Sequence, residues 1–480
     1  MNLLFLSNWE RTETWIAAGR ELERRGHRAF FAVTRDEYRR KALAAGFAAD
    51  RILWLTRQGA RAADIAAPLE DLARLEATAD IRVSDIILMD RFLRSERQDF
   101  ALRYAAYVHA ELKAFIDRHD IGLAIGQPDN VPDLLAEALL RTRGGRYAAP
   151  FEFRMPTRRF MLWDSRIEAR PHITGAPTPA DVTGAELAEA RAIRDRVTSG
   201  AKMRQVEARS GPPAIGAGFL KRLARGFLHR ALIVSRHDVY MYTLRSALFD
   251  LRYHMTPINH RRLARVWNRL FEQPRPGERF VFYALNYEPE HTLDVEAPHF
   301  VSTHETVRNI ARSLPLGVRL YVKEHPTGLG LRGPAALERI KRLPGVRLID
   351  PWVDSHALIK AAELTVSLSG TVSLEAAMYG RQTAILSDIF IAGFSTCRRL
   401  NAPWEVGAAL AAPPLEHQPE ADLRYLAWLI SNSHPGTVIE PLVDPTSLDP
   451  ENVARIADAI GKMIDQASAS STPTTRRSPD

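Results

Sequence analysis

Three short stretches in the second half of the chain place polar side chains directly after apolar, strand-like runs. They are NYEPEHT (286–292), KEHP (323–326) and SLSGTVSLE (367–375). Their carboxylates, histidines and hydroxyls are the groups that bind anions and transfer protons. An open α/β sheet builds its ligand site at the carboxyl ends of its strands. Whether the three stretches meet therefore depends on the elements that carry them.

The third stretch contains a Ser-Gly-Thr turn, Ser369 to Thr371, at the start of a helical pattern that includes Glu375. Hydroxyls and unpaired backbone N–H groups at the positive end of a helix dipole form an anion site. Ordinary N-capping by Ser369 or Thr371 explains the same residues without a ligand. A histidine at a second strand end shifts the balance from capping to a bound phosphate. Gly370 and Glu375 belong with Ser369 and Thr371 to the predicted phosphate-binding residues.

In the second stretch, Pro326 follows His325 directly. The residue before a proline avoids the helical region, so His325 is expected to be extended, with its imidazole facing out of the sheet edge towards a phosphate oxygen. A purely structural histidine is the alternative. Lys323 and Glu324 are adjacent on the strand and are expected on opposite faces. Both join the predicted phosphate-binding set.

In the first stretch, Glu288 and Glu290 are two residues apart, with Pro289 between them. In an extended segment both carboxylates face one way. Paired carboxylates suit glycosyl chemistry, in which one acts as base or nucleophile and the other positions hydroxyls. A solvated acidic loop is the alternative interpretation.

The elements around these stretches alternate between strand and helix. LLFLSN (3–8), RAFFAVT (28–34) and IGLAI (121–125) are predicted strands of the first half. In the second half, FVFYALN, VRLYVKE, VRLID, LTVSLS and TAILSD are predicted strands separated by helices at 304–314, 335–343, 355–362 and 372–379. Parallel strands need helical crossovers, so the pattern predicts an α/β protein with two Rossmann-like domains.

The expected organisation has four parts. Residues 1–190 form an N-terminal domain, 191–275 a basic helical connecting segment, 276–465 a C-terminal domain and 466–480 a disordered tail. Within 219–236, basic and apolar residues alternate at helical spacing. Such a helix either packs on a domain with its basic face solvated or contacts an anionic membrane. No nucleic-acid-binding motif accompanies the charge.

Composition narrows the function classes. The 480 residues carry a net charge of +8, which favours anionic partners, and 46% are hydrophobic, which suits a globular protein. The single Cys397 rules out an intramolecular disulfide and fits a reducing compartment. The amino terminus does not read as a signal peptide, and no run of about eighteen apolar residues occurs. We expect a cytoplasmic protein that is peripheral on the inner membrane.

The chain lacks a P-loop, a Gly-x-Gly-x-x-Gly after its first strand and a His-Glu-x-x-His sequence. The absence of the first two motifs argues against a kinase or a dehydrogenase, and the absence of the third argues against a metal site. No cofactor and no metal ion are expected.

NYEPEHT, LPLGVRLYVKEHP, GVRLIDP and SLSGTVSLEAAMYGR, in that order, resemble the bacterial capsule polysaccharide biosynthesis proteins, a family that includes β-Kdo transferases. The resemblance covers residues 280–387. It implies a metal-independent GT-B glycosyltransferase with two Rossmann-like domains facing across a cleft. The C-terminal domain would hold a nucleotide-sugar donor, with a CMP-linked acidic sugar such as Kdo favoured, and the N-terminal domain would face a glycan or lipid-linked acceptor.

The resemblance also implies roles for individual residues. His325, Ser369 and Thr371 would bind the phosphate of the donor. Asp129 and Asn130, at a strand end of the first domain, fall on the acceptor side, and Asp129 joins Glu288 and Glu290 as a candidate catalytic carboxylate. Two other functions fit the same architecture: a UDP-sugar 2-epimerase-like enzyme, and a non-catalytic factor of polysaccharide assembly or export.

Overall fold

The computed structural model describes residues 1–470 except 8–10, 156–157, 174, 289 and, apart from isolated positions, 201–255. The basic segment 219–236 expected to contact a membrane therefore lies outside the described residues, as does 471–480. Among the helices that are described, none combines the length and apolarity needed to cross a membrane.

The N-terminal domain is built on a seven-stranded sheet in the order β13-β6-β5-β4-β1-β2-β3. Its strands are β1 (Asn2–Ser7), β2 (Arg28–Val33), β3 (Ile52–Trp54), β4 (Ile121–Ile125), β5 (Arg146–Glu152), β6 (Arg159–Trp163) and β13 (Ser433–Pro435). β1 to β5 are parallel, and β6 is antiparallel to both its neighbours. The crossover helices are α1 (Thr12–Arg24), α2 (Asp36–Ala44), α3 (Arg57–Ala62), α4 (Ala66–Thr78), α5 (Val83–Met89), α6 (Gln98–His119) and α7 (Val131–Arg141).

The C-terminal domain holds a six-stranded, entirely parallel sheet in the order β12-β11-β10-β7-β8-β9. Its strands are β7 (Arg279–Ala284), β8 (Val318–Lys323), β9 (Val346–Ile349), β10 (Leu364–Ser367), β11 (Thr383–Ile385) and β12 (Cys397–Arg399). Its helices are α11 (Thr256–Leu270), α12 (His291–Asp294), α13 (Thr303–Ser313), α14 (Pro334–Lys341), α15 (Ser355–Ala361), α16 (Thr371–Met378), α17 (Val406–Ala411) and α18 (Pro419–Ser431). The strand interiors are buried, as expected for a sheet covered on both faces.

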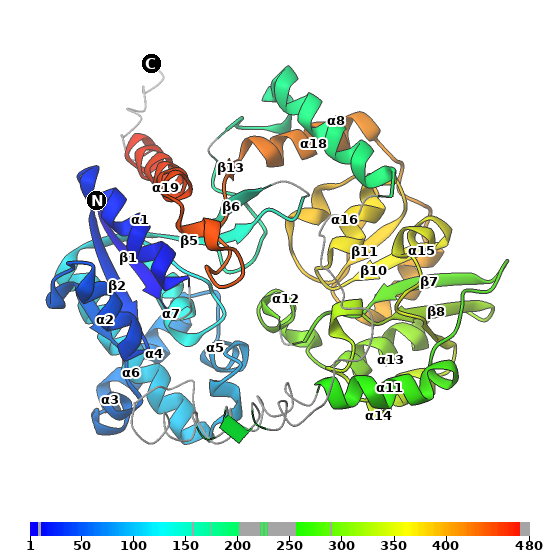
Figure 1. Cartoon of the computed structure of the whole chain (residues 1–480), viewed down its shortest axis with the longest axis horizontal. Helices are drawn as coiled ribbons and strands as arrows, with labels where there is room; N and C mark the ends of the chain where they lie inside the picture. The colour runs from blue at the N-terminus through cyan, green and yellow to red at the C-terminus, as the bar shows by residue number, and fades with distance from the viewer. Residues whose placement is uncertain are drawn as a thin grey trace, which may run out of the picture.

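The chain crosses between the domains more often than its sequence pattern indicates. After α18 it returns to the N-terminal sheet as β13, and α19 (Pro450–Ser470) packs on α1 (Figure 1). Conversely, α8 (Gly184–Thr198) packs on α18, and α11 packs on α14. These contacts bury one face of each helix. The two domains therefore do not follow the expected limits at 190, 275 and 465, and α19 continues past the expected start of the tail.

Both sheets have a point at which the direction of strand addition reverses. In the N-terminal sheet the chain runs outward from β1 to β3 and resumes at β4 on the other side of β1. In the C-terminal sheet it runs from β7 to β9 and resumes at β10. A ligand of an open α/β sheet binds outside the carboxyl ends of the strands at such a reversal. Figure 1 shows the two domains side by side, with α12 of the C-terminal domain between them. The predicted fold class, two Rossmann-like α/β domains, is confirmed.

Candidate active site between the domains

The three polar stretches lie at one edge of the C-terminal sheet. They follow β7, β8 and β10, and β7 pairs in parallel with both of the others. Because parallel strands end at the same edge, the residues after these strands are brought together at the reversal point between β7 and β10. This proximity was expected from the sequence; the roles of the residues remain proposals.

The Ser-Gly-Thr turn forms the start of α16. Gly370 is the N-cap residue, and the helix has no hydrogen bond from a capping side chain, so capping by Ser369 or Thr371 does not account for the turn. The Gly370 N–H donates to Ser367 Oγ at 3.1 Å, and Ser367 Oγ lies 2.7 Å from Ser373 Oγ. Ser369 is buried and Thr371 is partly exposed. The hydroxyl of Thr371 is therefore the more accessible one at this helix start.

The side chains of the Lys-Glu-His sequence differ in their exposure. His325 is exposed, and its ring lies edge-on to that of Tyr287 with centroids 6.4 Å apart. Lys323 is buried and donates to Ser355 Oγ at 2.8 Å, at the start of α15. Glu324 is also buried and accepts from Arg332 Nη1 at 2.8 and 3.0 Å. Of the three, only His325 is exposed, and Lys323 and Glu324 are buried with partners inside the domain.

Arg332 organises this side of the edge, although no motif in the sequence singles it out. Its Nη2 lies 2.6 Å from Glu288 Oε1 and donates to the carbonyl of Asn286 at 2.8 Å. Glu288 also accepts from the hydroxyl of Thr303. Burial raises the pKa of Glu324, and Arg332 opposes that shift. The guanidinium thus ties the end of β7 to the end of β8.

The other side of the edge is formed by the start of α12. Glu290 is its N-cap residue and accepts from Thr292 Oγ1 at 2.9 Å. His291 is buried with its ring 4.8 Å from that of Phe151 in the N-terminal domain. Neither of its ring nitrogens has a hydrogen-bond partner within the described part of the chain. Burial lowers the pKa of His291, so its imidazole is neutral near pH 7.

The N-terminal domain meets α12 through Asp129 and two arginines. Asp129 and Asn130 follow β4, and Asn130 Oδ1 accepts from the Asp133 N–H to cap α7. Asp129 Oδ2 lies 3.4 Å from Arg91 Nη2, which is also 3.5 Å from Asp294 Oδ2 across the seam. Arg94 Nη1 lies 2.6 Å from Asp294 Oδ1. Asp129 therefore faces the C-terminal domain, whereas Asn130 supports its own helix.

Arg154 makes a second bridge, which sequence reasoning also missed. Just beyond β5, it donates to both oxygens of Glu168 in its own domain and to Glu296 of the other at 2.7 to 3.2 Å. It also donates to the Ser369 carbonyl in the predicted phosphate turn. Burial raises the pKa of Glu168 to about 7, Arg154 opposes the shift and Glu296 adds to it. A guanidinium from the N-terminal domain thus reaches the turn at the start of α16.

Two cavities in the described part of the chain are not lined by any residue that directly follows β7, β8 or β10. A small one at the reversal point of the N-terminal sheet is lined by Leu6, Arg11, Thr12, Trp15, Gln127, Asn130 and Asp133. A larger one, of about 690 Å³, lies at the opposite end of β5. The site proposed here is therefore defined by its side chains at the seam and not by either cavity.

No protein-family model and no curated protein matches the chain. Among solved structures, it is similar to Thermosulfurimonas dismutans KpsC, beta Kdo 2,7 transferase, at 12% identity over 74% of this chain and 89% of that chain, with a TM-score of 0.33. It is similar to UDP-GlcNAc 2-epimerase from Methanocaldococcus jannaschii at 11% identity over 88% and 98% of the two chains, with a TM-score of 0.26. The glycotransferase of kitacinnamycin matches at 14% identity over 96% and 98%, with a TM-score of 0.24.

Identities and scores at this level assign no activity. The two Rossmann-like domains, the reversal point at the carboxyl edge of each sheet and the return of the chain to its first domain are all present in the structure itself. On that architecture, the chain has a GT-B fold.

Proposed function

We propose that this protein is a glycosyltransferase that moves a sugar from a nucleotide donor onto a glycan or lipid-linked acceptor in surface polysaccharide synthesis. One observation supports the proposal most: three adjacent parallel strands end in an exposed histidine, a helix start without a side-chain cap and a group of carboxylates. The favoured donor is a CMP-linked acidic sugar such as Kdo, as the resemblance of the strand-end motifs implies.

Transfer requires stabilisation of the phosphate that leaves with the nucleotide. His325 supplies an exposed imidazole, and the start of α16 supplies backbone N–H groups and the Thr371 hydroxyl at the positive end of a helix dipole. Preorganised donors of this kind stabilise developing negative charge without reorganising during the reaction. The proposed mechanism therefore needs no metal ion.

Transfer also requires a group that takes the proton of the acceptor hydroxyl. Glu288 is held by Arg332 and Thr303, which suits a carboxylate that orients the loop or the sugar. Asp129 lies on the acceptor domain and faces α12, and Glu290 begins that helix. We propose Asp129 and Glu290 as the alternative bases, because both lie where the two domains meet.

Nucleotide binding tests the donor site directly. Thermal shift and calorimetric titration with CMP, UDP, GDP and ADP are expected to show stabilisation by CMP, worth about 2.7 kcal/mol at a hundredfold excess over Kd. His325→Ala and Thr371→Val are expected to weaken CMP binding at least tenfold. His304→Ala, which removes a partly exposed histidine on α13, serves as the matched control.

Ser369→Ala tests the buried hydroxyl of the turn and is interpreted only where its unfolding midpoint matches that of the wild type. A preference for UDP would overturn the CMP assignment and favour the epimerase-like enzyme or a different transferase. Absence of binding to all four nucleotides would overturn the donor site and favour the non-catalytic assembly factor.

A further inference from the structure

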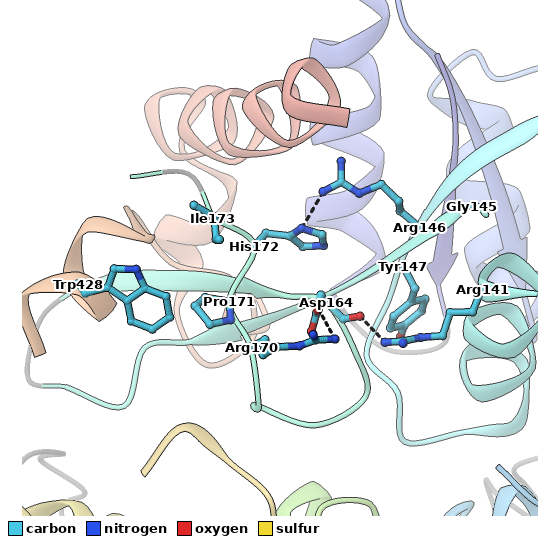
Figure 2. Close-up of a pocket in the computed structure, with 10 residues that line it drawn as sticks. All are labelled: Arg141, Gly145, Arg146, Tyr147, Asp164, Arg170, Pro171, His172, Ile173 and Trp428. Atoms are coloured by element: carbon cyan, nitrogen blue, oxygen red, sulfur yellow. Dashed lines mark hydrogen bonds and ion pairs between the residues drawn. The ribbon is translucent and has the colours of Figure 1, made fainter. Parts of the chain in front are cut away.

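A cavity of about 690 Å³ lies at the amino end of β5, away from the candidate active site (Figure 2). Its walls are the end of α7, the start of β5, the loop 164–173 after β6 and Trp428 of α18. β5 spans Arg146–Glu152, and at about 3.3 Å per residue its two ends are about 20 Å apart. The cavity is therefore separate from the seam that holds Arg154 and Ser369.

The cavity has a positively charged lining. Arg141, Arg146 and Arg170 line it with a single carboxylate, that of Asp164. Arg141 donates to the Asp164 carbonyl at 2.6 Å, and Arg170 Nη2 lies 3.2 Å from Asp164 Oδ2. The Arg170 side chain is 75% exposed, so it stands at the mouth and can reach a ligand. An anionic group is the complement of this lining.

His172 is the buried partner of Arg146. Arg146 Nη2 lies 2.8 Å from His172 Nδ1, and because a guanidinium can only donate, Nδ1 accepts and the ring proton is on Nε2. His172 is only 8% exposed and also hydrogen-bonds to the backbone of Tyr147, so it holds Arg146 in place from inside the cavity wall. Figure 2 shows this pair on one wall of the cavity, with Trp428 at the far end.

Trp428 supplies an aromatic wall at the far end of the cavity. Its ring stacks on that of Tyr425, with ring centroids 5.6 Å apart, which holds the indole in place. An aromatic wall of this kind suits a ligand that has an apolar ring face.

We propose that this cavity is a second binding site that takes an acidic saccharide, with its carboxylate on the arginines and its sugar ring against Trp428. The Trp428 ring supplies an apolar face for the sugar ring, and a cavity of this volume suits a small oligosaccharide. A bare anion would leave the face of the indole without a contact, and a neutral sugar would leave the arginines without an anion. The site stands whether or not the strand-end site binds a CMP-sugar.

The loop 164–173 connects this cavity to the domain seam. Asp164 and His172, near its two ends, line the cavity, whereas Glu168 in its middle holds Arg154 and accepts the Phe390 N–H of the C-terminal domain through its carbonyl at 2.8 Å. A saccharide in the cavity thus contacts the loop on both sides of the interdomain bridge.

Calorimetry on the full chain tests the site with trigalacturonate as the probe. Trigalacturonate is expected to bind at least tenfold more tightly than neutral maltotriose or inorganic phosphate. Arg170→Gln, at an exposed position that should not disturb folding, is expected to weaken binding at least tenfold, and Trp428→Leu, which removes the ring face, several-fold. Arg424→Gln, on the exposed face of the same helix as Trp428, should leave binding unchanged.

Several results would overturn the inference. Failure of trigalacturonate to bind would do so, and so would equal binding of maltotriose or of phosphate, because either would mean that carboxylate and sugar are not recognised together. An equal loss in Arg424→Gln would show that the effect is general to the surface. The His325→Ala variant should bind trigalacturonate normally; a loss there would place the probe in the cleft and reject the second site.

Discussion

At the scale of single residues, the buried pair of Glu324 and Arg332 is the most consequential contact at the candidate site. Arg332→Gln would leave Glu324 buried without its cation, and breaking a buried ion pair in this way costs about 3–5 kcal/mol. We expect that loss in the free energy of unfolding measured with urea. The double variant Arg332→Gln with Glu324→Gln should recover part of it, because no uncompensated charge remains. A single variant within about 0.5 kcal/mol of the wild type would contradict this account.

Sequence reasoning found the polar residues of this edge but not their cations. The proline after His325 and the strand before it were enough to predict that the imidazole faces outward, and it is exposed. Arg332 lies in LGLRGP, after a turn, and Arg154 lies in the other domain. Their partners are 8 and 215 residues away, respectively, in the contacts with Glu324 and Ser369. No local pattern encodes such pairings, since they depend on how loops fold back and how the domains dock.

At the scale of elements, the turn that follows His325 is shaped by Gly330. Its φ of +91° favours glycine, and a Cβ there would lie 2.4 Å from the Thr256 carbonyl oxygen of α11. Gly345 offers a matched comparison, since its φ is +78° and a Cβ there would meet nothing within 4 Å. Gly345→Ala is expected to cost about 1–2 kcal/mol through backbone strain alone. Gly330→Ala should cost at least about 2 kcal/mol more in chemical denaturation, because α11 must move; equal costs would show that the close approach is relieved without penalty.

The elements of the C-terminal domain were the part of the fold best predicted from the sequence. The runs VRLYVKE, LTVSLS and TAILSD begin where β8, β10 and β11 begin and extend one to three residues past their ends, because short apolar strands alternate there with amphipathic helices. The crossings were not predicted. β13 is only three residues long, and α19 has the amphipathic pattern of any surface helix, so neither reveals which domain it joins. Which domain β13 and α19 join depends on surfaces formed by residues early in the chain.

At the scale of the whole molecule, the bridge between the domains carries more negative than positive charge, and this predicts a pH dependence. Glu168 and Glu296 share one guanidinium in a buried place, and burial raises the pKa of Glu168 to about 7. The folded protein thus holds a proton that the unfolded chain releases near pH 4.5. Above pH 4.5 the unfolded state binds fewer protons than the folded state, so this contribution to stability is complete below that pH and is lost as the pH rises to about 7.

Glu168→Gln, which imitates the protonated carboxyl, should remove this part of the slope. Free energies of unfolding at pH 5, 6, 7 and 8 are expected to fall by up to about 3 kcal/mol more in the wild type than in the variant across the window from pH 5 to 7. Glu416→Gln, at an exposed position of the C-terminal domain, should keep the wild-type slope. Identical slopes in wild type and Glu168→Gln would show that Glu168 is ionised in the closed seam and that Arg154 balances both carboxylates. The interdomain bridge would then be insensitive to pH in this range.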